Sequence, residues 1–382
     1  MRILWTMIAA MLVAGAAPAA SAQEDAIDAA VKAAMTRTGV KGLALAVIED
    51  GKPVSVRSYG VRNPADAPLE TDTVMYGASL TKTLFAYTVM QLVDEGRIDL
   101  DKPIAAMLPK PLPDYGNLDA YGNWGDLAAD PRWRTITPRM VLTHSTGFAN
   151  FAFDEPDGKL RIHFDPGSRY AYSGEGIILL QFGIEKGLGL DLGAEMQRRV
   201  FDRFGMKTTS MKWRADFARN MADGWTLEGA VEPHDERSRV RAAGSMDTTI
   251  ADMARFAAGL IRGDGLRTGS LRELIRGQLP ITTASQFPSL QPEAPVAARP
   301  KGVAAGLGVI AFAGPQGAGF FKGGHNDSTA NTLVCVAQRR RCVVILSNDV
   351  RAEAAFPELV RVAIGETGVP WHWEYPRLFG KR

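Results

Sequence analysis

Strand-like segments lie near both ends of this chain of 382 residues, and mostly helical patterns lie between them. Near the N-terminus, residues 43–48 and 54–59 flank Asp50-Gly51, a dipeptide that favours a tight hairpin turn. Near the C-terminus, the strand-like segments are residues 306–312, 320–324, 332–336 and 343–346. A single sheet that combines the strands from both ends of the chain is the simplest arrangement that buries all of them. The pattern therefore predicts an α/β (α+β) fold, in which helices flank an antiparallel sheet and a mostly helical lobe is inserted in the middle.

Helical periodicity places several helices in the middle of the chain and one near each end. The expected helices are residues 24–36, 79 to about 95, 178–184, 195–204, 249–261 and 352–364. Two stretches rich in proline or glycine, residues 112–134 and 280–300, are expected to be irregular. The chain is longer than the roughly 250–300 residues that a single core usually serves. We therefore expect a helical lobe of about residues 79–207 and a sheet lobe formed by about 23–78 and 208–382.

The first 22 residues have the pattern of a secretory signal. Arg2 gives a positive start, residues 3–17 are apolar, and Ala20-Ser21-Ala22 matches the A-x-A cleavage pattern. A membrane anchor is the alternative, but the apolar run is shorter than the ~20 residues that a span needs. We expect cleavage after Ala22, which leaves residues 23–382 as a periplasmic or secreted protein with no stable membrane span.

Export determines how the two cysteines are interpreted. Cys335 and Cys342 lie in neighbouring strand-like runs with a predicted turn at residues 338–340, so a hairpin would place them roughly opposite each other. An oxidising compartment permits a disulfide between them, and two buried free thiols are the alternative. Two cysteines and five histidines make a Cys-ligated metal site improbable. The net charge of +2 argues against nucleic acid as the main partner.

Ser79 and Lys82 form the one Ser-x-x-Lys pattern in the chain, at the predicted start of a helix. A spacing of three places both side chains on one helix face, a turn apart. An ammonium at that distance stabilises a serine alkoxide, and the helix N-terminus adds partial positive charge. The pattern alone is weak, because an N-cap serine followed by an exposed lysine also produces it.

The segment around Ser79 and several later segments resemble one enzyme family in the same order. Residues 71–83 (TDTVMYGASLTKT) resemble the nucleophile segment of the serine β-lactamase and penicillin-binding-protein superfamily, in the branch of class C β-lactamases, D,D-peptidases and related esterases. Further similar segments are residues 96–104, 136–148, 165–174 and 242–249. The resemblance implies a β-lactamase/transpeptidase-like fold and a serine hydrolase. It assigns the nucleophile to Ser79, with Lys82 beside it, and implies an acyl-serine intermediate without a metal or organic cofactor.

Three tyrosines compete for the role of base that the resemblance implies. Tyr115 and Tyr121 each begin a Tyr-x-Asn sequence, whereas Tyr172 is followed by Ser-Gly. Because Tyr172 alone follows a Pro-Gly lead-in and precedes a predicted helix, as in the family, we assign the base to Tyr172. A phenol is a poor base near pH 7 unless nearby cations stabilise the phenolate. His144 is interpreted as structural, because no Gly-x-Ser-x-Gly elbow supplies it with a serine partner.

The resemblance places the second cation at Lys322, in Lys322-Gly323-Gly324, where the family carries Lys-Thr-Gly. His325 is a rival for this role, because related esterases often have a histidine at the lysine position. In the family, the residue after Lys-x-Gly shares the oxyanion hole with the nucleophile. The resemblance therefore assigns the oxyanion-binding N–H groups to Ser79 and His325, with Gly324 beside them.

Two glycines depart from the pattern of the β-lactam- and peptide-cleaving members. Gly174 stands where those members have an asparagine that binds an acyl-amide side chain, and Gly323 replaces a threonine that binds a substrate carboxylate. An activated ester depends less on such orientation. We therefore expect hydrolysis of a small-molecule carboxylic ester or small amide, and we expect Gly174→Asn to favour cephalosporin hydrolysis. Asp327, near the expected pocket mouth, could favour a cationic group.

Two alternatives to the esterase remain. The first is a β-lactamase or a D-alanyl-D-alanine carboxypeptidase, which would act on a β-lactam or a cell-wall peptide. The second belongs to another class, a non-catalytic β-lactam or peptidoglycan binder. Labelling of the serine by a covalent probe separates this binder from the hydrolases when turnover is measured beside it.

Overall fold

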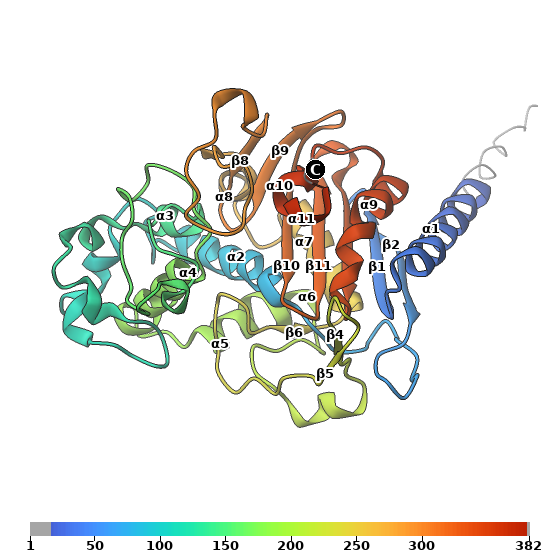
Figure 1. Cartoon of the computed structure of the whole chain (residues 1–382), viewed down its shortest axis with the longest axis horizontal. Coiled ribbons are helices and arrows are strands. Elements are labelled where there is room, and N and C mark those ends of the chain that lie inside the picture. Colours follow the sequence, from blue (N-terminus) through green and yellow to red (C-terminus); the bar gives the residue numbers. More distant parts are fainter. Residues whose placement is uncertain (1–16, 380–382) are drawn as a thin grey trace, which may run out of the picture.

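A large antiparallel sheet forms the centre of the molecule in the computed structural model, which describes residues 17–379 (Figure 1). Its strand order is β2-β1-β12-β11-β10-β9-β8-β7, and neighbouring strands pair antiparallel. The N-terminal strands therefore lie beside the C-terminal ones, which confirms the expected sheet built from both ends of the chain. The strands are β1 (Gly42–Glu49), β2 (Lys52–Gly60), β7 (Leu279–Pro280), β8 (Val303–Ala305), β9 (Ile310–Gly314), β10 (Gly317–His325), β11 (Ala330–Val336) and β12 (Arg341–Ser347).

Two short strand pairs lie outside the large sheet. Strand β3 (Met75–Tyr76) pairs with β6 (Asp247–Thr248), and β4 (Gly224–Trp225) pairs with β5 (Val231–Glu232). The β3–β6 pair matters for function, because β3 ends three residues before Ser79. It ties the segment that leads into Ser79 to a part of the chain far away in sequence.

Helices cover both faces of the sheet (Figure 1). Side chains of β1 alternate between two apolar clusters, as the period of two of a strand requires. One cluster joins the sheet to α2 (Thr81–Asp94) and α7 (Ile250–Arg262), and the other joins it to α1 (Ala17–Thr38) and α9 (Phe356–Ile364). The other α-helices are α3 (Pro138–Leu142), α4 (Gly174–Phe182), α5 (Leu192–Met196), α6 (Asp202–Phe204), α8 (Thr268–Ile275), α10 (Trp371–Glu374) and α11 (Pro376–Phe379).

Residues 79–207 form helices, short helical turns and loops without a β-strand. Helix α2 differs from the expected helix with one apolar side, because every residue from Thr81 to Leu92 is buried. It lies inside the larger apolar cluster, so that all its sides contact other parts of the protein. That cluster contains residues from both expected lobes, and the division into two lobes stays a prediction.

Several expected boundaries shift for local reasons. Only the last three residues of the expected strand 306–312 form a strand, as part of β9, because the chain turns at Gly308, with a φ of 70°, between β8 and β9. The expected helix 352–364 begins as a 3-10 turn, Val350–Ala355, and the α-helix starts at Phe356, where Pro357 fits the first turn. Helices α10 and α11 were not expected, because four residues show no periodicity.

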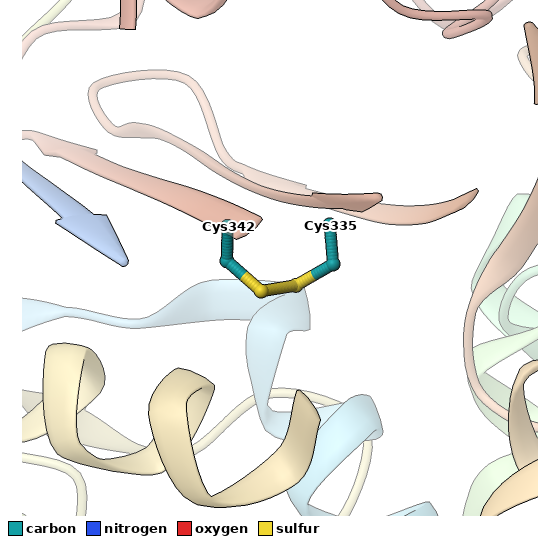
Figure 2. Close-up of a disulfide and its surroundings, with 2 residues drawn as sticks. All are labelled: Cys335 and Cys342. Atoms are coloured by element: carbon teal, nitrogen blue, oxygen red, sulfur yellow. A yellow bond between two sulfur atoms is a disulfide. The ribbon is translucent and has the colours of Figure 1, made fainter. Parts of the chain in front are cut away.

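The hairpin of β11 and β12 contains a disulfide (Figure 2). Cys335 pairs directly with Cys342 in the strand register, and a turn at Gln338–Arg340 joins the strands. Of the two alternatives for these cysteines, the structure therefore has the disulfide. Both side chains are fully buried in the cluster that contains α2 and α7.

Residues 1–16, which include most of the expected signal, lie outside the described residues. Helix α1 spans the expected cleavage position after Ala22. Beyond that position, Ile27, Val31 and Ala34 are buried against the sheet, so the part of α1 that contributes to the core follows the cleavage position. Among the helices between residues 17 and 379, none is long and apolar enough to cross a membrane.

Candidate active site

Ser79 lies in a 3-10 turn, Ala78–Leu80, directly before the N-terminus of α2. The turn is held from both sides. Tyr76 pairs with β6, and its carbonyl oxygen accepts a hydrogen bond of 2.9 Å from Asn331 Nδ2 on β11. Ala78 has a φ of 46°, a left-handed conformation that is costly for a residue with a Cβ and needs such support. Ser79 itself is half-buried and lines a cavity.

Lys82 and Tyr172 both contact the Ser79 hydroxyl. Lys82 Nζ lies 2.9 Å from Ser79 Oγ, and the Tyr172 hydroxyl donates to the same oxygen at 2.8 Å. Lys82 Nζ also donates to the carbonyl oxygen of Ala243 at 2.5 Å, which fixes the end of a long side chain. Lys82 and Tyr172 are almost fully buried, so their polar atoms are directed to a few partners instead of bulk water.

The other two tyrosines lie elsewhere. The Tyr115 ring packs on Phe182 with ring centres 4.9 Å apart, and the Tyr121 hydroxyl donates to Glu185. Neither residue lines the cavity that contains Ser79. His144 is buried behind Tyr172, with ring centres 4.4 Å apart, and its Nδ1 accepts the N–H of Ser173. His144 thus orients the Tyr172 segment and does not contact Ser79.

Strand β10 brings Lys322, Gly324 and His325 to the opposite side of Ser79. Lys322 Nζ lies 5.1 Å from the centre of the Tyr172 ring and donates to the carbonyl oxygen of Gly323 at 2.6 Å, so it faces Tyr172 instead of Ser79 Oγ. A Cβ on Gly324 would lie 3.1 Å from the Ser79 nitrogen and 2.9 Å from the Leu80 nitrogen. Only a glycine lets β10 approach the nucleophile turn this closely.

The side chain of His325 turns away from Ser79. Its Nδ1 lies 2.8 Å from Glu353 Oε1, in the segment that precedes α9. Burial lowers the pKa of His325, but the carboxylate of Glu353 outweighs burial and leaves the pKa above its usual value. The imidazole of His325 therefore forms its own charge pair, whereas its backbone follows Gly324 beside the nucleophile turn.

Burial controls the protonation of the groups around Ser79. Burial, together with the nearby Lys322, lowers the pKa of Lys82 well below its usual value. Burial also lowers the pKa of Lys322, to about 8, although Glu374 acts in the opposite direction. The pKa of Tyr172 is raised by burial, more than the hydrogen bond to Ser79 lowers it. We expected the cations to favour a phenolate at Tyr172, but desolvation dominates and favours the neutral phenol.

Other side chains fill the space beside the two glycines that depart from the family pattern. A Cβ on Gly174 would overlap the ring of Phe151, and Asn150 Oδ1 accepts the Gly174 N–H at 2.9 Å. A Cβ on Gly323 would overlap Glu374 Oε1. The space that an asparagine or a threonine side chain would need is therefore occupied at both positions.

The cavity above Ser79 has a volume of about 600 Å³ and is open to solvent. Sequence reasoning missed several of its lining residues, namely Asn150, Phe151, Gln286, Phe287 and Glu374. Asn150 and Phe151 lie two and three residues after the similar segment 136–148, a signal that could have identified them. Glu374 follows no motif and reaches the cavity only through the fold. Asp327, expected near the mouth, does not line the cavity.

A family profile described as Beta-lactamase matches residues 27–364 of the chain. The chain belongs to the Beta-lactamase family. This match covers nearly the whole described structure. It includes the four residues assigned to the site, Ser79, Lys82, Tyr172 and Lys322. The expected relationship to serine β-lactamases and penicillin-binding proteins is thereby confirmed.

Curated relatives of this Beta-lactamase family member include an esterase and an acyltransferase. A lovastatin esterase from Penicillium rubens is 28% identical over 160 residues, which cover 36% of this chain and 40% of that protein. The acyltransferase CalJ from Penicillium decumbens is 36% identical over 92 residues, which cover 24% of this chain and 22% of that protein. The matched regions thus span less than half the length of these two relatives.

Solved structures show the same fold over nearly the whole chain. The D-alanine carboxypeptidase AmpC from Burkholderia cenocepacia superimposes with a TM-score of 0.71 and covers 91% of this chain and 99% of its own. The sequence identity is 18%, so the similarity concerns the fold alone. The expected α/β fold with an antiparallel sheet flanked by helices is confirmed by this likeness.

Proposed function

We propose that this Beta-lactamase family member is an exported serine hydrolase that cleaves a carboxylic ester or small amide through an acyl-serine at Ser79. The observation that carries the proposal is the contact of Ser79 Oγ with both Lys82 Nζ and Tyr172 Oη at the floor of an open cavity. Nucleophile and proton acceptor within hydrogen-bond reach are what covalent catalysis needs. The fold provides them from α2 and from the segment before α4.

The pKa directions favour Lys82 over Tyr172 as the acceptor of the Ser79 proton. A lowered pKa makes the neutral amine of Lys82 accessible near neutral pH, whereas the phenolate of Tyr172 becomes less accessible. Ser79 Oγ then bonds to the carbonyl carbon as its proton moves to Lys82 Nζ. The oxyanion that forms would be held by the N–H groups of Ser79 and His325, where each donor is worth roughly 10²–10³ in rate.

Tyr172 is placed to complete the proton transfer. Its hydroxyl would protonate the departing alkoxide or amine, and the Lys82 ammonium would then return a proton to the Tyr172 phenolate. Water then attacks the acyl carbon as one of its protons moves to the neutral amine of Lys82. The bond between that carbon and Ser79 Oγ breaks, Ser79 Oγ takes up this proton, and the carboxylic acid is released. Lys322, beside the Tyr172 ring, would stabilise the negative charge that develops on the phenol oxygen.

Two phenylalanines support an apolar acyl group and an ester substrate. Phe151 fills the space beside Gly174, and the Phe287 ring packs against Tyr172 with ring centres 5.0 Å apart. Both rings line the cavity near Ser79. An ester with an apolar acyl chain would bury its methylene groups there, each worth about 0.8 kcal/mol. The similarity to a lovastatin esterase is consistent with this substrate class.

A β-lactamase or D-alanyl-D-alanine carboxypeptidase is the second candidate, and one observation favours it. Asn150 lines the cavity, and its Oδ1 accepts from Gly174. This hydrogen bond orients the side-chain amide of Asn150. Its NH₂ group could then donate to a substrate in place of the asparagine side chain that is absent at position 174. The solved carboxypeptidase that shares the fold is consistent with this alternative. We rank it second because the Phe151 ring occupies most of the same space.

Covalent labelling tests the nucleophile. We expect a fluorophosphonate probe to label the purified protein and to leave Ser79→Ala unlabelled. Ser238→Ala is the matched control, because Ser238 lines the same cavity but makes no contact with Lys82, and it should be labelled like the wild type. Labelling of Ser79→Ala, or stable labelling without turnover of any ester, would contradict the proposal and favour a non-catalytic binder in the second case.

Turnover of p-nitrophenyl butyrate and of a chromogenic cephalosporin tests the substrate order. We expect the ester to be hydrolysed at least tenfold faster in kcat/KM, a difference of about 1.4 kcal/mol. The sequence suggested that Gly174→Asn would favour cephalosporin hydrolysis. We do not expect this of the single substitution, because Phe151 occupies the space that the asparagine side chain would need. Gly174→Asn combined with Phe151→Ala should raise cephalosporin hydrolysis relative to the ester. Faster cephalosporin turnover by the wild type would place the second candidate first.

A further inference from the structure

A buried carboxylate stands beside Lys322 and Gly323. Glu374 belongs to α10, is almost fully buried and lines the cavity. Its Oε2 accepts a hydrogen bond of 2.8 Å from Gln286 Nε2, and Gln286 Oε1 accepts one of 2.7 Å from the Tyr170 hydroxyl. The other oxygen, Oε1, faces Gly323, where a Cβ would overlap it. The carboxylate is thus held in the space that the missing threonine side chain would fill.

Backbone contacts hold α10 in the same place. Gln286 N donates to the carbonyl oxygen of Trp373 at 2.9 Å, and Trp373 Nε1 donates to Thr283 Oγ1 at 3.2 Å. Trp373 is fully buried in the cluster that also contains Tyr170. The position of Glu374 is therefore determined by the core.

The two cationic side chains on this side of the cavity, Lys322 and His325, are influenced by carboxylates of the protein. Burial raises the pKa of Glu374 above its usual value, although Lys322, His325 and the hydrogen bond from Gln286 act in the opposite direction. Glu374 in turn favours the charged form of Lys322. His325 is paired with Glu353 at 2.8 Å. A substrate carboxylate that approached Gly323 would meet Glu374 Oε1, which occupies the space beside that glycine. Repulsion between like charges is strong where burial weakens the screening by water.

The arginines of the cavity lie on its other wall. Arg237 bonds to Asp247 Oδ1 at 3.2 Å, and Arg239 and Arg241 donate to the carbonyl oxygen of Asp119 at 3.2 Å each. All three are in the segment 235–245, which also contributes Asp235 and Glu236 to the lining. None of these three arginines is among the groups that shift the pKa of Glu374, and each bonds to a partner other than Glu374.

We propose that Glu374 is a specificity-determining residue, which excludes carboxylate-bearing esters from the side of the cavity at Gly323 and favours esters that carry a neutral or cationic group there. The inference rests on the proposed ester hydrolysis and names the class of ester. Glu374 Oε1 can accept a hydrogen bond from an ammonium or from an N–H group of the substrate. It has no favourable contact to offer a carboxylate.

Three acetate esters of similar phenols test the proposal: methyl 3-acetoxybenzoate (neutral), 3-acetoxybenzoate (anionic) and 3-acetoxyphenyltrimethylammonium (cationic). Each kcat/KM is divided by the rate of hydrolysis of the same ester by hydroxide, which corrects for the leaving group. For the wild type we expect the anionic ester to be at least tenfold poorer than the other two. In Glu374→Gln, which keeps the hydrogen bond from Gln286, this discrimination should fall by about tenfold.

Glu236→Gln is the matched control, because it removes one negative charge from the cavity rim but not from Gly323. We expect it to change the ratio less than twofold. Glu374→Asp keeps the charge and should keep the discrimination. If Glu374→Gln does not fold, the inhibition constants of two boronic acids for the wild type test the same proposal. Phenylboronic acid should then bind at least tenfold more tightly than 3-carboxyphenylboronic acid.

The outcomes separate this inference from the proposed function. Equal turnover of the anionic and neutral esters by the wild type would overturn the role of Glu374 and leave the esterase intact. An unchanged ratio in Glu374→Gln, or an equal shift in Glu236→Gln, would have the same consequence. If the wild type hydrolyses none of the three esters and Ser79 is not labelled, both proposals fail.

Discussion

Lys82 and Lys322 are both buried next to Tyr172, yet their surroundings assign them different charges. Lys82 has Ser79 Oγ and the Ala243 carbonyl as neighbours and no anion, so burial favours its neutral amine. Lys322 has Glu374 nearby, which favours its ammonium. Two lysines that would repel each other if both were charged can therefore coexist. In the proposed mechanism, Lys82 would accept the Ser79 proton while Lys322 stays a cation.

This division predicts a bell-shaped pH profile of kcat/KM. Activity should rise with pH as Lys82 loses its proton, and it should fall above about 8 as Lys322 loses its own. In Lys322→Arg the guanidinium stays protonated, so the falling limb should move to higher pH. Rates of p-nitrophenyl butyrate hydrolysis between pH 5 and about 10 measure this. A falling limb that stays near pH 8 in Lys322→Arg would show that another group causes it.

The residues that the sequence identified are those with a local signature. Ser79 and Lys82 have a fixed spacing, and Tyr172 follows a Pro-Gly lead-in. Glu374 lies on a helix of four residues near the C-terminus, and its proximity to Gly323 results from the packing of α10 against residues 283–286. Likewise, the raised pKa of Tyr172 depends on complete burial, which no motif reports.

At the scale of elements, the site depends on how closely β10 approaches the turn before α2. Gly324 is the contact point, since its Cα faces the nitrogen atoms of Ser79 and Leu80. The antiparallel sheet could be predicted from the strands at both chain ends. The turn at residues 306–309, where a strand was expected, could not be predicted, because it forms where Leu307 and Gly308 bond to the carbonyl oxygens of Leu274 and Leu142 in other elements.

Gly324→Ala should lower kcat by about 10²-fold. The added methyl group would push β10 away from Ser79 and displace the N–H of His325 from the expected oxyanion hole. Burst amplitude with p-nitrophenyl acetate and steady-state rates measure the effect. Gly319→Ala would overlap Phe312, and Gly317 has a left-handed φ of 84° that strains an alanine, so neither of these glycines of β10 is a suitable control. Gly269→Ala on α8 meets no neighbouring atom and is the control, with an expected kcat equal to that of the wild type. Unchanged activity in Gly324→Ala would contradict the close approach.

The disulfide of the β11–β12 hairpin should contribute stability and not activity. Cys335 and Cys342 are separated by 7 residues and close a short loop, for which the loss of unfolded-state entropy corresponds to about 2 kcal/mol. The double variant Cys335→Ala/Cys342→Ala should unfold at lower denaturant concentration than the wild type and retain its kcat. The strand register around the pair holds the hairpin together without the bond. Equal stability of the two proteins would assign the disulfide no such role.

For the whole molecule, the sheet is covered on one face by α2 and α7 and on the other by α1 and α9. The site lies where the helical segment 79–207 meets the sheet. Because this sheet contains strands from both ends of the chain, the site forms only when both ends have folded. Helix α1 contributes Ile27, Val31 and Ala34 to the second face, all after the expected cleavage position. Removal of residues 1–22 therefore leaves this apolar cover intact.

Export and disulfide formation should be visible together in the mass of the mature protein. Expression of the full sequence in a bacterium with a periplasm should yield a periplasmic product that begins at Gln23 and is lighter than the reduced chain 23–382 by two hydrogen atoms. The physical reason is that the A-x-A sequence ends at Ala22 and that the compartment beyond the membrane oxidises thiols.

A variant with Ala20→Arg and Ala22→Arg should stay uncleaved, because signal peptidase requires small residues at these positions. Expression of residues 23–382 in the cytoplasm is the complementary control, and we expect Cys335 and Cys342 to be reduced there. A periplasmic product that still carries residues 1–22 would instead support the membrane anchor, and the hydrolase would then act at the membrane surface.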